Sequence, residues 1–206
     1  GSMVYTRPVI AAFDRQRGLA LGVGASGTSI ASILVSPLLA WMIESRASIL
    51  RDGTEIVLET VPVDPRDLLR GDYVILSYPL SRLESTKITG TVPPSDGAKP
   101  VYVALVPGEG GRHVFSRASW QPISDLKPEE VLIAGKTPES FYMPTETVQL
   151  DYGIERYYVP EGEGKPIEDG VRQNSVDVMV VVNKSGMAQI KGLRLDGATL
   201  YEEPLY

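Results

Sequence analysis

Residues 54–60 read Thr54-Glu55-Ile56-Val57-Leu58-Glu59-Thr60, which alternates with the period of a half-buried β-strand. A second β-rich run, Tyr73-Val74-Ile75-Leu76-Ser77-Tyr78, follows a Gly-Asp turn. Further predicted strands, separated by turn residues, are 100–106, 113–119, 147–152, 154–159, 176–183, 187–193 and 195–201. We therefore expect a mainly β fold, an antiparallel sandwich or partly open barrel, with one or two short helices, at 127–132 and 165–173.

The composition excludes several classes of function. The 206-residue chain has a formal net charge of -6, and its 20 Lys and Arg residues are scattered, so we expect no nucleic-acid partner. It has no cysteine and a single histidine, His113, which excludes thiolate ligands and paired-histidine zinc sites. We predict no metal and no cofactor. His113 itself is expected to be a surface or strand-edge residue.

Residues 18–43 contain no charged side chain over a length that crosses a bilayer as a helix. We predict a transmembrane helix here, with a cleaved signal segment or a buried core helix as the alternatives. We therefore divide the chain into an N-terminal tag and tail at 1–17, the transmembrane helix at 18–43 and a β domain at 44–206.

The charges that flank this predicted helix indicate its orientation, and its small residues indicate how it could associate with another helix. Three arginines precede it, Arg7, Arg15 and Arg17, whereas mixed charges follow it, which places the N-terminus in the cytoplasm and the β domain outside. A row of small residues, Gly18, Gly22 and Ser26, recurs every four positions and permits a helix-mediated homo-oligomer or a partner helix.

Residues 71–78 fill the pattern G-D-Y-x-x-L-x-Y at all its fixed positions: Gly71, Asp72, Tyr73, Leu76 and Tyr78. The chain here resembles the GDYXXLXY family of membrane-anchored bacterial proteins. Segments 50–55, 63–70 and 152–164 also look like that family, so the resemblance spans about residues 40–206.

The resemblance implies one helix in the bacterial inner membrane, an extracytoplasmic domain and a polytopic membrane protein as a partner, but no catalytic residues. A second resemblance covers residues 5–40, where 13–22 looks like a charged loop and helix of a major facilitator superfamily transporter. A lone helix cannot transport, because such transporters need about a dozen helices.

Charged residues gather just before and within the motif: Asp64, Arg66, Asp67, Arg70 and Asp72. They could form a carboxylate-lined pocket or a cation site. The alternative is that they make turns, with Asp67 capping a helical turn and Gly71-Asp72 leading into a strand. In that strand Tyr73, Ile75 and Ser77 would share one face, and Val74, Leu76 and Tyr78 the other.

A glycine-rich acidic loop at 160–165 carries Glu161 and Glu163. Its carboxylates could approach a cation or a peptide, although the loop lacks the ligand pattern of an EF-hand. The alternative is an ordinary solvated loop.

The function expected from these features is a membrane-tethered accessory or interaction domain of the bacterial envelope. The alternative is an envelope enzyme or a small-ligand-binding module with a carboxylate and arginine site. A Ser-Lys hydrolase is disfavoured, because a serine nucleophile without a positioned base and oxyanion donors is not a catalytic site.

Overall fold

The computed structural model of the chain describes residues 35–37, 44, 46–61, 73–94, 96–142, 145–158, 167, 176–195 and 197–202. The chain divides into two compact units, residues 1–46 and 47–206. Most of the predicted transmembrane segment 18–43 lies outside the described residues. Within the described ranges, no helix is long and apolar enough to cross a membrane.

The second unit begins with helical residues that run directly into its first strand. Its residues 47–52 are helical, and β1 follows at Thr54–Glu59. Gly53 joins them, and its N–H donates to the Ile49 carbonyl at 3.0 Å. A Cβ at this position would lie 2.5 Å from Val181 Cγ1, so only glycine fits the close approach of the helix to the sheet.

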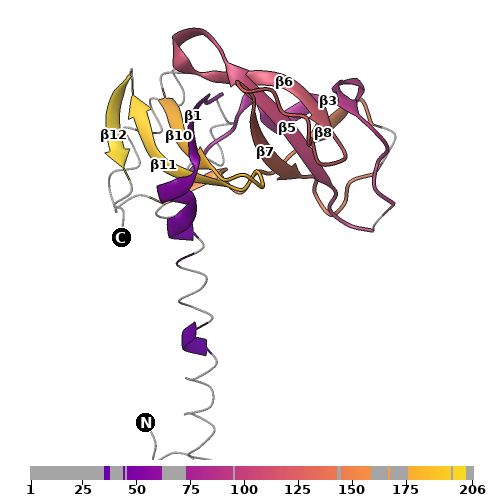
Figure 1. The fold of residues 1–206 in the computed structure, drawn as a ribbon, viewed down its shortest axis with the longest axis horizontal. Coiled ribbons are helices and arrows are strands. Elements are labelled where there is room, and N and C mark those ends of the chain that lie inside the picture. The colour runs from indigo at the N-terminus through magenta and orange to yellow at the C-terminus, as the bar shows by residue number, and fades with distance from the viewer. Residues whose placement is uncertain are drawn as a thin grey trace, which may run out of the picture. The chain divides into compact units, whose positions relative to one another are not determined.

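The first four-stranded sheet has the order β1-β10-β11-β12 and is antiparallel throughout. Its other strands are β10 Val176–Val182, β11 Ala188–Leu195 and β12 Ala198–Glu202 (Figure 1). β10 reads VDVMVVV and is buried at every residue except Asp177. A nearly continuous apolar sequence is typical of a strand that is covered on both faces.

The second four-stranded sheet has the order β4-β6-β5-β7. Its strands are β4 Ile88–Thr89, β5 Pro100–Pro107, β6 His113–Ser119 and β7 Val131–Lys136. β5 pairs antiparallel with both β6 and β7, whereas β4 pairs parallel with β6. The connection between β5 and β6 is a 3-10 turn, η3 Glu109–Gly111, in which Gly110 has φ of 67°.

Two short antiparallel ribbons complete the described fold. β2 Tyr73–Ile75 pairs with β9 Arg156–Tyr158, and β3 Arg82–Glu84 pairs with β8 Thr147–Gln149. The 3-10 turns η1 Pro79–Ser81 and η2 Ser85–Lys87 flank β3. All four sheets contribute to one hydrophobic core, represented by Ile56, Val74, Leu83, Val103 and Val178.

The mainly β, mostly antiparallel fold is confirmed, and none of the described sheets closes on itself. The predicted strands at 54–60, 100–106, 113–119 and 176–183 correspond to β1, β5, β6 and β10. Four glycines in connections between strands have positive φ, as tight turns require: Gly110, Gly153, Gly186 and Gly197.

The helix predicted at 127–132 is wrong. Lys127–Glu130 makes a single turn, closed by a 3.0 Å bond from the Glu130 N–H to the Lys127 carbonyl. Residues from Val131 onward then pair with β5 as strand β7. Ladder hydrogen bonds and burial against β5 outweigh the weak local helix preference. Of the other predicted helix, 165–173, only Ile167 is described, as a buried helical residue.

Candidate functional site

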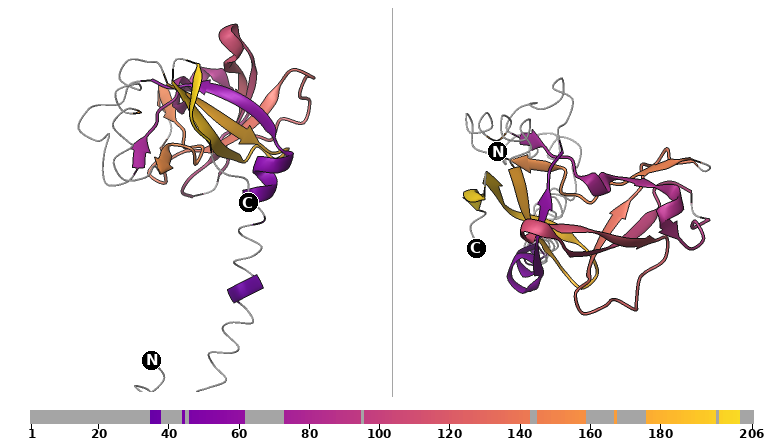
Figure 2. Two further views of the ribbon diagram at one scale, coloured as in Figure 1. Left: turned by 90° about the vertical axis from the view of Figure 1, so that its left-hand side faces the viewer. Right: turned by 90° about the horizontal axis from the view of Figure 1, so that it is seen from above.

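The β2–β9 ribbon joins two segments that the sequence singled out separately. Tyr73 pairs with Tyr158, Val74 with Tyr157 and Ile75 with Arg156. The ribbon is the short pair of magenta and orange arrows that lie side by side in both views of Figure 2. The hydrogen bond from the Leu76 N–H to the Glu155 carbonyl, at 2.8 Å, extends the pairing by one residue. The motif at 71–78 therefore docks against the block at 151–158.

The motif strand has one buried and one outward face, as its alternation predicts. Val74, Leu76 and Tyr78 are 0%, 1% and 1% exposed, whereas Tyr73 and Ile75 are only partly buried. The motif residues Leu76 and Tyr78 are therefore parts of the core. Tyr73 is the motif residue among these that remains partly accessible.

Two tyrosine hydroxyls link the motif segment to the 151–158 segment, one donated from each segment. The Tyr78 hydroxyl donates to the Ile154 carbonyl at 2.6 Å. The Tyr152 hydroxyl donates to the Leu80 carbonyl at 2.8 Å. Burial, with a smaller contribution from the charge of Glu155, raises the pKa of both phenols above the usual range. Both tyrosines are thus fixed hydrogen-bond donors of the scaffold.

The outward face of the ribbon carries two tyrosines and an arginine. The rings of Tyr73 and Tyr158 are tilted at 54°, with centroids 5.7 Å apart. The Arg156 guanidinium carbon lies 5.8 Å from the Tyr73 ring centroid, within the range of a cation–π interaction. Tyr158 is 69% exposed. Tyr and Arg are, with Trp, enriched among the hot-spot residues of protein interfaces.

A carboxylate pair lies at the turn that leads into β9. Asp151 and Glu155 share a side-chain hydrogen bond, and Glu155 Oε1 also accepts the Tyr152 N–H at 2.7 Å. Burial, together with the hydrogen bond and charge of Asp151, raises the pKa of Glu155 to about 7. Burial opposes ionisation of Asp151 as well, but hydrogen bonds from Glu155 and the Gly153 N–H lower its pKa. The pair therefore holds a proton close to neutral pH.

This pair opens onto a cavity of about 600 Å³ between the ribbons. Arg82 and Arg156 line the same cavity, together with residues on the motif side such as Ser77. Two carboxylates whose pKa values diverge can divide the roles of acid and base. Both also make local turn bonds, since Asp151 Oδ1 accepts the Gly153 N–H at 2.8 Å. The arrangement can exchange a proton or bind a polar ligand, and it stabilises the turn in either case.

Most of the site residues predicted from sequence lie outside the described residues: Asp64, Arg66, Asp67, Arg70, Gly71, Asp72, Glu161 and Glu163. Segment 62–72 joins β2 at Tyr73, and segment 159–166 joins β9 at Tyr158, and these two residues are paired.

Arg156, Tyr158 and Glu155 were not predicted as site residues. The available signal was their position in the family-like block at 152–164, next to the tyrosine-rich sequence Arg156-Tyr157-Tyr158. Among the described residues, no group of three or more His, Asp or Glu side chains is placed to hold a metal ion.

Comparison with known proteins supports the family resemblance of the motif and of the segment that pairs with it. No curated protein and no solved structure matches the chain. A family model described as GDYXXLXY protein matches residues 35–193, more than half of the chain. Residues 5–34 of the transporter-like segment precede the matched range. The match includes the motif, both ribbons and the carboxylate pair, so the chain belongs to the GDYXXLXY protein family.

Proposed function

We propose that the chain is a membrane-tethered accessory domain of the bacterial envelope that binds a polytopic membrane protein through the outward face of the β2–β9 ribbon. The observation that carries this proposal is the cluster of Tyr73, Tyr158 and Arg156 on that face. Tyr158 is an exposed aromatic side chain held in place by a neighbouring ring, so binding would immobilise few further torsions.

The buried part of the motif favours a binding role over catalysis. Leu76 and Tyr78 fill the core, and the Tyr78 hydroxyl is already bonded to the Ile154 carbonyl. These two motif residues fix the register of β2 against β9 and so position the outward face. A rigid ribbon that presents aromatic and cationic side chains is a suitable platform for recognition.

The tether in this proposal is the uncharged segment 18–43, with the N-terminus in the cytoplasm and the β domain outside. The finer architecture that we propose is a sandwich or partly open barrel preceded by one transmembrane helix. Helical residues 46–52 lead into β1, as a short connection from a membrane helix would. The small residues Gly18, Gly22 and Ser26 would allow a homo-oligomer or a helix partner.

The second candidate function is an enzyme or small-ligand-binding module of the envelope. The observation that favours it is the proton-sharing pair Asp151 and Glu155 in a cavity that Arg82 and Arg156 also line. Replacement of Asp151 by Asn would then abolish ligand binding or turnover, while a purely structural pair would lose only stability.

The tether is tested by sodium carbonate extraction of membranes, combined with protease digestion of intact spheroplasts. We expect the chain to stay with the membrane and the β domain to be cut from outside. Release into the soluble fraction with a protected domain would contradict the tether.

The binding surface is tested by co-purification of membrane proteins with the tagged full chain. Tyr158→Ala should reduce recovery of a partner, because the substitution removes the exposed ring of the cluster. Tyr142→Ala is the matched control, since Tyr142 is 82% exposed but lies in the loop between β7 and β8. Equal loss in both variants would count against a specific surface on the ribbon.

A further inference from the structure

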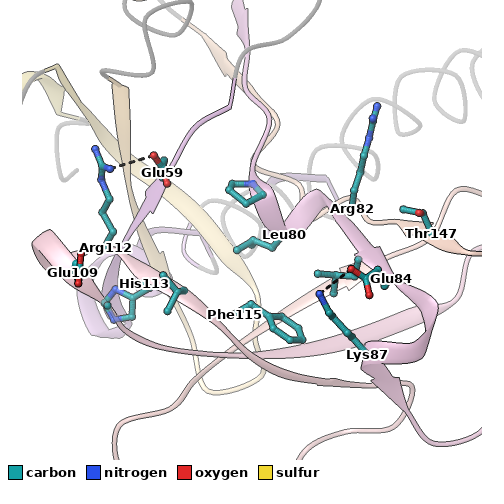
Figure 3. A pocket seen from close by; sticks show the side chains of 14 residues that line it. Glu59, Leu80, Arg82, Glu84, Lys87, Glu109, Arg112, His113, Phe115 and Thr147 are labelled. Carbon is teal, nitrogen blue, oxygen red and sulfur yellow. Dashed lines mark hydrogen bonds and ion pairs between the residues drawn. The ribbon is translucent and has the colours of Figure 1, made fainter.

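A second and larger cavity, of about 960 Å³, lies on the face formed by β1, β3 and β6 (Figure 3). Its middle is apolar: Leu80, Leu83 and Phe115 line it, together with Val114, which is 47% exposed. The volume is at the upper end of the range for ligand sites. None of the three outward residues of the β2–β9 ribbon lines it.

One end of this cavity has an excess of negative charge. Arg112 Nη1 donates to Glu59 at 3.2 Å, and Arg112 Nε lies 2.9 Å from Asp177 Oδ1 as an ion pair. Glu109 lines the same end. His113 beside them is neutral in this arrangement, because its Nδ1 accepts the Val57 N–H at 3.4 Å. Two carboxylates, Glu59 and Glu109, thus line this end with one guanidinium, and this end favours a cationic group.

The other end has an excess of positive charge. Lys87 bonds Glu84 at 3.0 Å, with the lysine side chain half exposed. Arg82 lines the cavity at the same end, and its guanidinium points away from that ion pair. Figure 3 shows the Arg112–Glu59 and Lys87–Glu84 pairs on opposite sides, with Leu80 and Phe115 between them. The cavity is therefore bipolar.

The backbone of β1 adds a hydrogen-bonding edge to the cavity. β1 is an outer strand of its sheet, and the Val57 N–H points away from β10 because it bonds His113. Backbone groups two residues apart point the same way in an antiparallel strand, so those of Glu59 also face away from β10, at the cavity wall. The outward N–H groups on either side are already bonded, that of Val57 to His113 and that of Val61 to the Ser77 carbonyl at 2.9 Å, so Glu59 is the residue of β1 whose backbone can meet a peptide strand here.

We propose that this cavity binds a peptide segment in extended conformation, apolar in its middle, basic towards Glu59 and Glu109, and acidic towards Lys87. The charge of the two ends complements such a segment, and Leu80 and Phe115 receive its apolar side chains. A fatty acyl chain fits less well, because it carries charge at one end and would leave charged groups at the other end against hydrocarbon. This site is separate from the ribbon surface proposed above.

The test is selection of random 12-residue peptides, displayed on phage, against the full chain purified in detergent. The Val114→Glu variant serves as the reference, since it places a charge in the cavity at a partly exposed position where folding should be retained. We expect the enriched peptides to carry basic and acidic residues on opposite sides of apolar ones. We expect them to bind Val114→Glu at least about tenfold more weakly, a difference of roughly 1.4 kcal/mol.

Two further variants make the outcome specific. Lys87→Glu should weaken a selected peptide about tenfold and by less in high salt, because it reverses the charge of one end. Tyr158→Ala should leave the affinity unchanged, which separates this site from the ribbon surface. The proposal is overturned if no sequence is enriched on the wild type over Val114→Glu. It is equally overturned if native mass spectrometry finds a lipid that the wild type retains and Val114→Glu does not.

Discussion

The Tyr78 hydroxyl donates to the carbonyl of Ile154 at 2.6 Å, across 76 positions of sequence. Tyr78 is the last fixed residue of the family motif, and Ile154 lies in the turn that leads into β9. The bond joins the motif to the segment that pairs with it. It explains why a tyrosine, and not a phenylalanine, suits this core position.

Tyr78→Phe should destabilise the domain by about 1–3 kcal/mol, because it leaves the buried Ile154 carbonyl without its donor. Chemical denaturation monitored by circular dichroism measures the change. Tyr158→Phe is the control, since the hydroxyl of an exposed tyrosine is solvated in both states. Equal stability of the wild type and Tyr78→Phe would show that the bond contributes little.

Glu155 should make the domain less stable as pH rises from about 5 to 7. Its pKa in the folded protein is about 7, against 4.5 for the unfolded chain, so the folded state holds more protons in this window and loses stability as they dissociate. Glu155→Gln, which mimics the protonated acid, should remove this slope in thermal unfolding across pH 5–8.

His113 acts in the opposite sense and must be separated from Glu155. Burial lowers its pKa below 6.5, so its contribution to stability rises with pH below that value. Comparison of Glu155→Gln with the wild type cancels the histidine contribution. If the two proteins keep the same pH slope, Glu155 does not hold the proton.

Glu130 should contribute far more to stability than Asp125, although both bind Arg117. The Glu130 side chain is 1% exposed and accepts bonds from Ser116, Arg117 and the Lys127 N–H, whereas Asp125 is 76% exposed. Glu130→Gln should lower the thermal midpoint clearly, and Asp125→Asn should change it little. A larger effect at Asp125 would contradict this assignment.

Bonds to Arg117, and one to Lys127, lower the pKa of Glu130 to about 2. The stability that Glu130 supplies is therefore complete above its unfolded pKa of 4.5 and is lost as pH falls towards 2. Glu130→Gln should have a lower free energy of unfolding than the wild type near neutral pH. That free energy should also fall less steeply than in the wild type as pH drops towards 2.

Gly53→Ala should destabilise the domain by about 1–3 kcal/mol through overpacking. The new Cβ would lie 2.6 Å from the Ile49 carbonyl oxygen, which is backbone and cannot move aside easily. Asp52→Ala, one residue earlier and exposed, should stay within about 0.5 kcal/mol of the wild type. Unfolding in urea compares the two variants.

The described strands show what local sequence can predict. β6 spans His113–Ser119, the range predicted for it from the sequence. β3 and β4, of three and two residues, were not predicted. The helix at 127–132 was predicted wrongly because residues from Val131 onward pair with β5, a contact between distant segments that no local pattern encodes.

At the candidate site too, local sequence predicted the faces of a strand but not the contacts between distant segments. The alternation of 73–78 predicted that Val74, Leu76 and Tyr78 share one face, and the structure shows that this face is the buried one. The pairing of Tyr73 with Tyr158 depends on contact between strands 85 residues apart, so sequence could not place Arg156 over the Tyr73 ring. The roles of Asp64, Asp72, Glu161 and Glu163 remain predictions.

The most direct test of the central claim is site-specific photo-crosslinking in living cells. A benzophenone amino acid would replace Tyr158 in one strain and Tyr142 in another, since both tyrosines are exposed. We expect an adduct with a polytopic membrane protein from position 158 and none from position 142. An absence of any adduct at 158, or the same adducts from both positions, would contradict a binding surface on the β2–β9 ribbon.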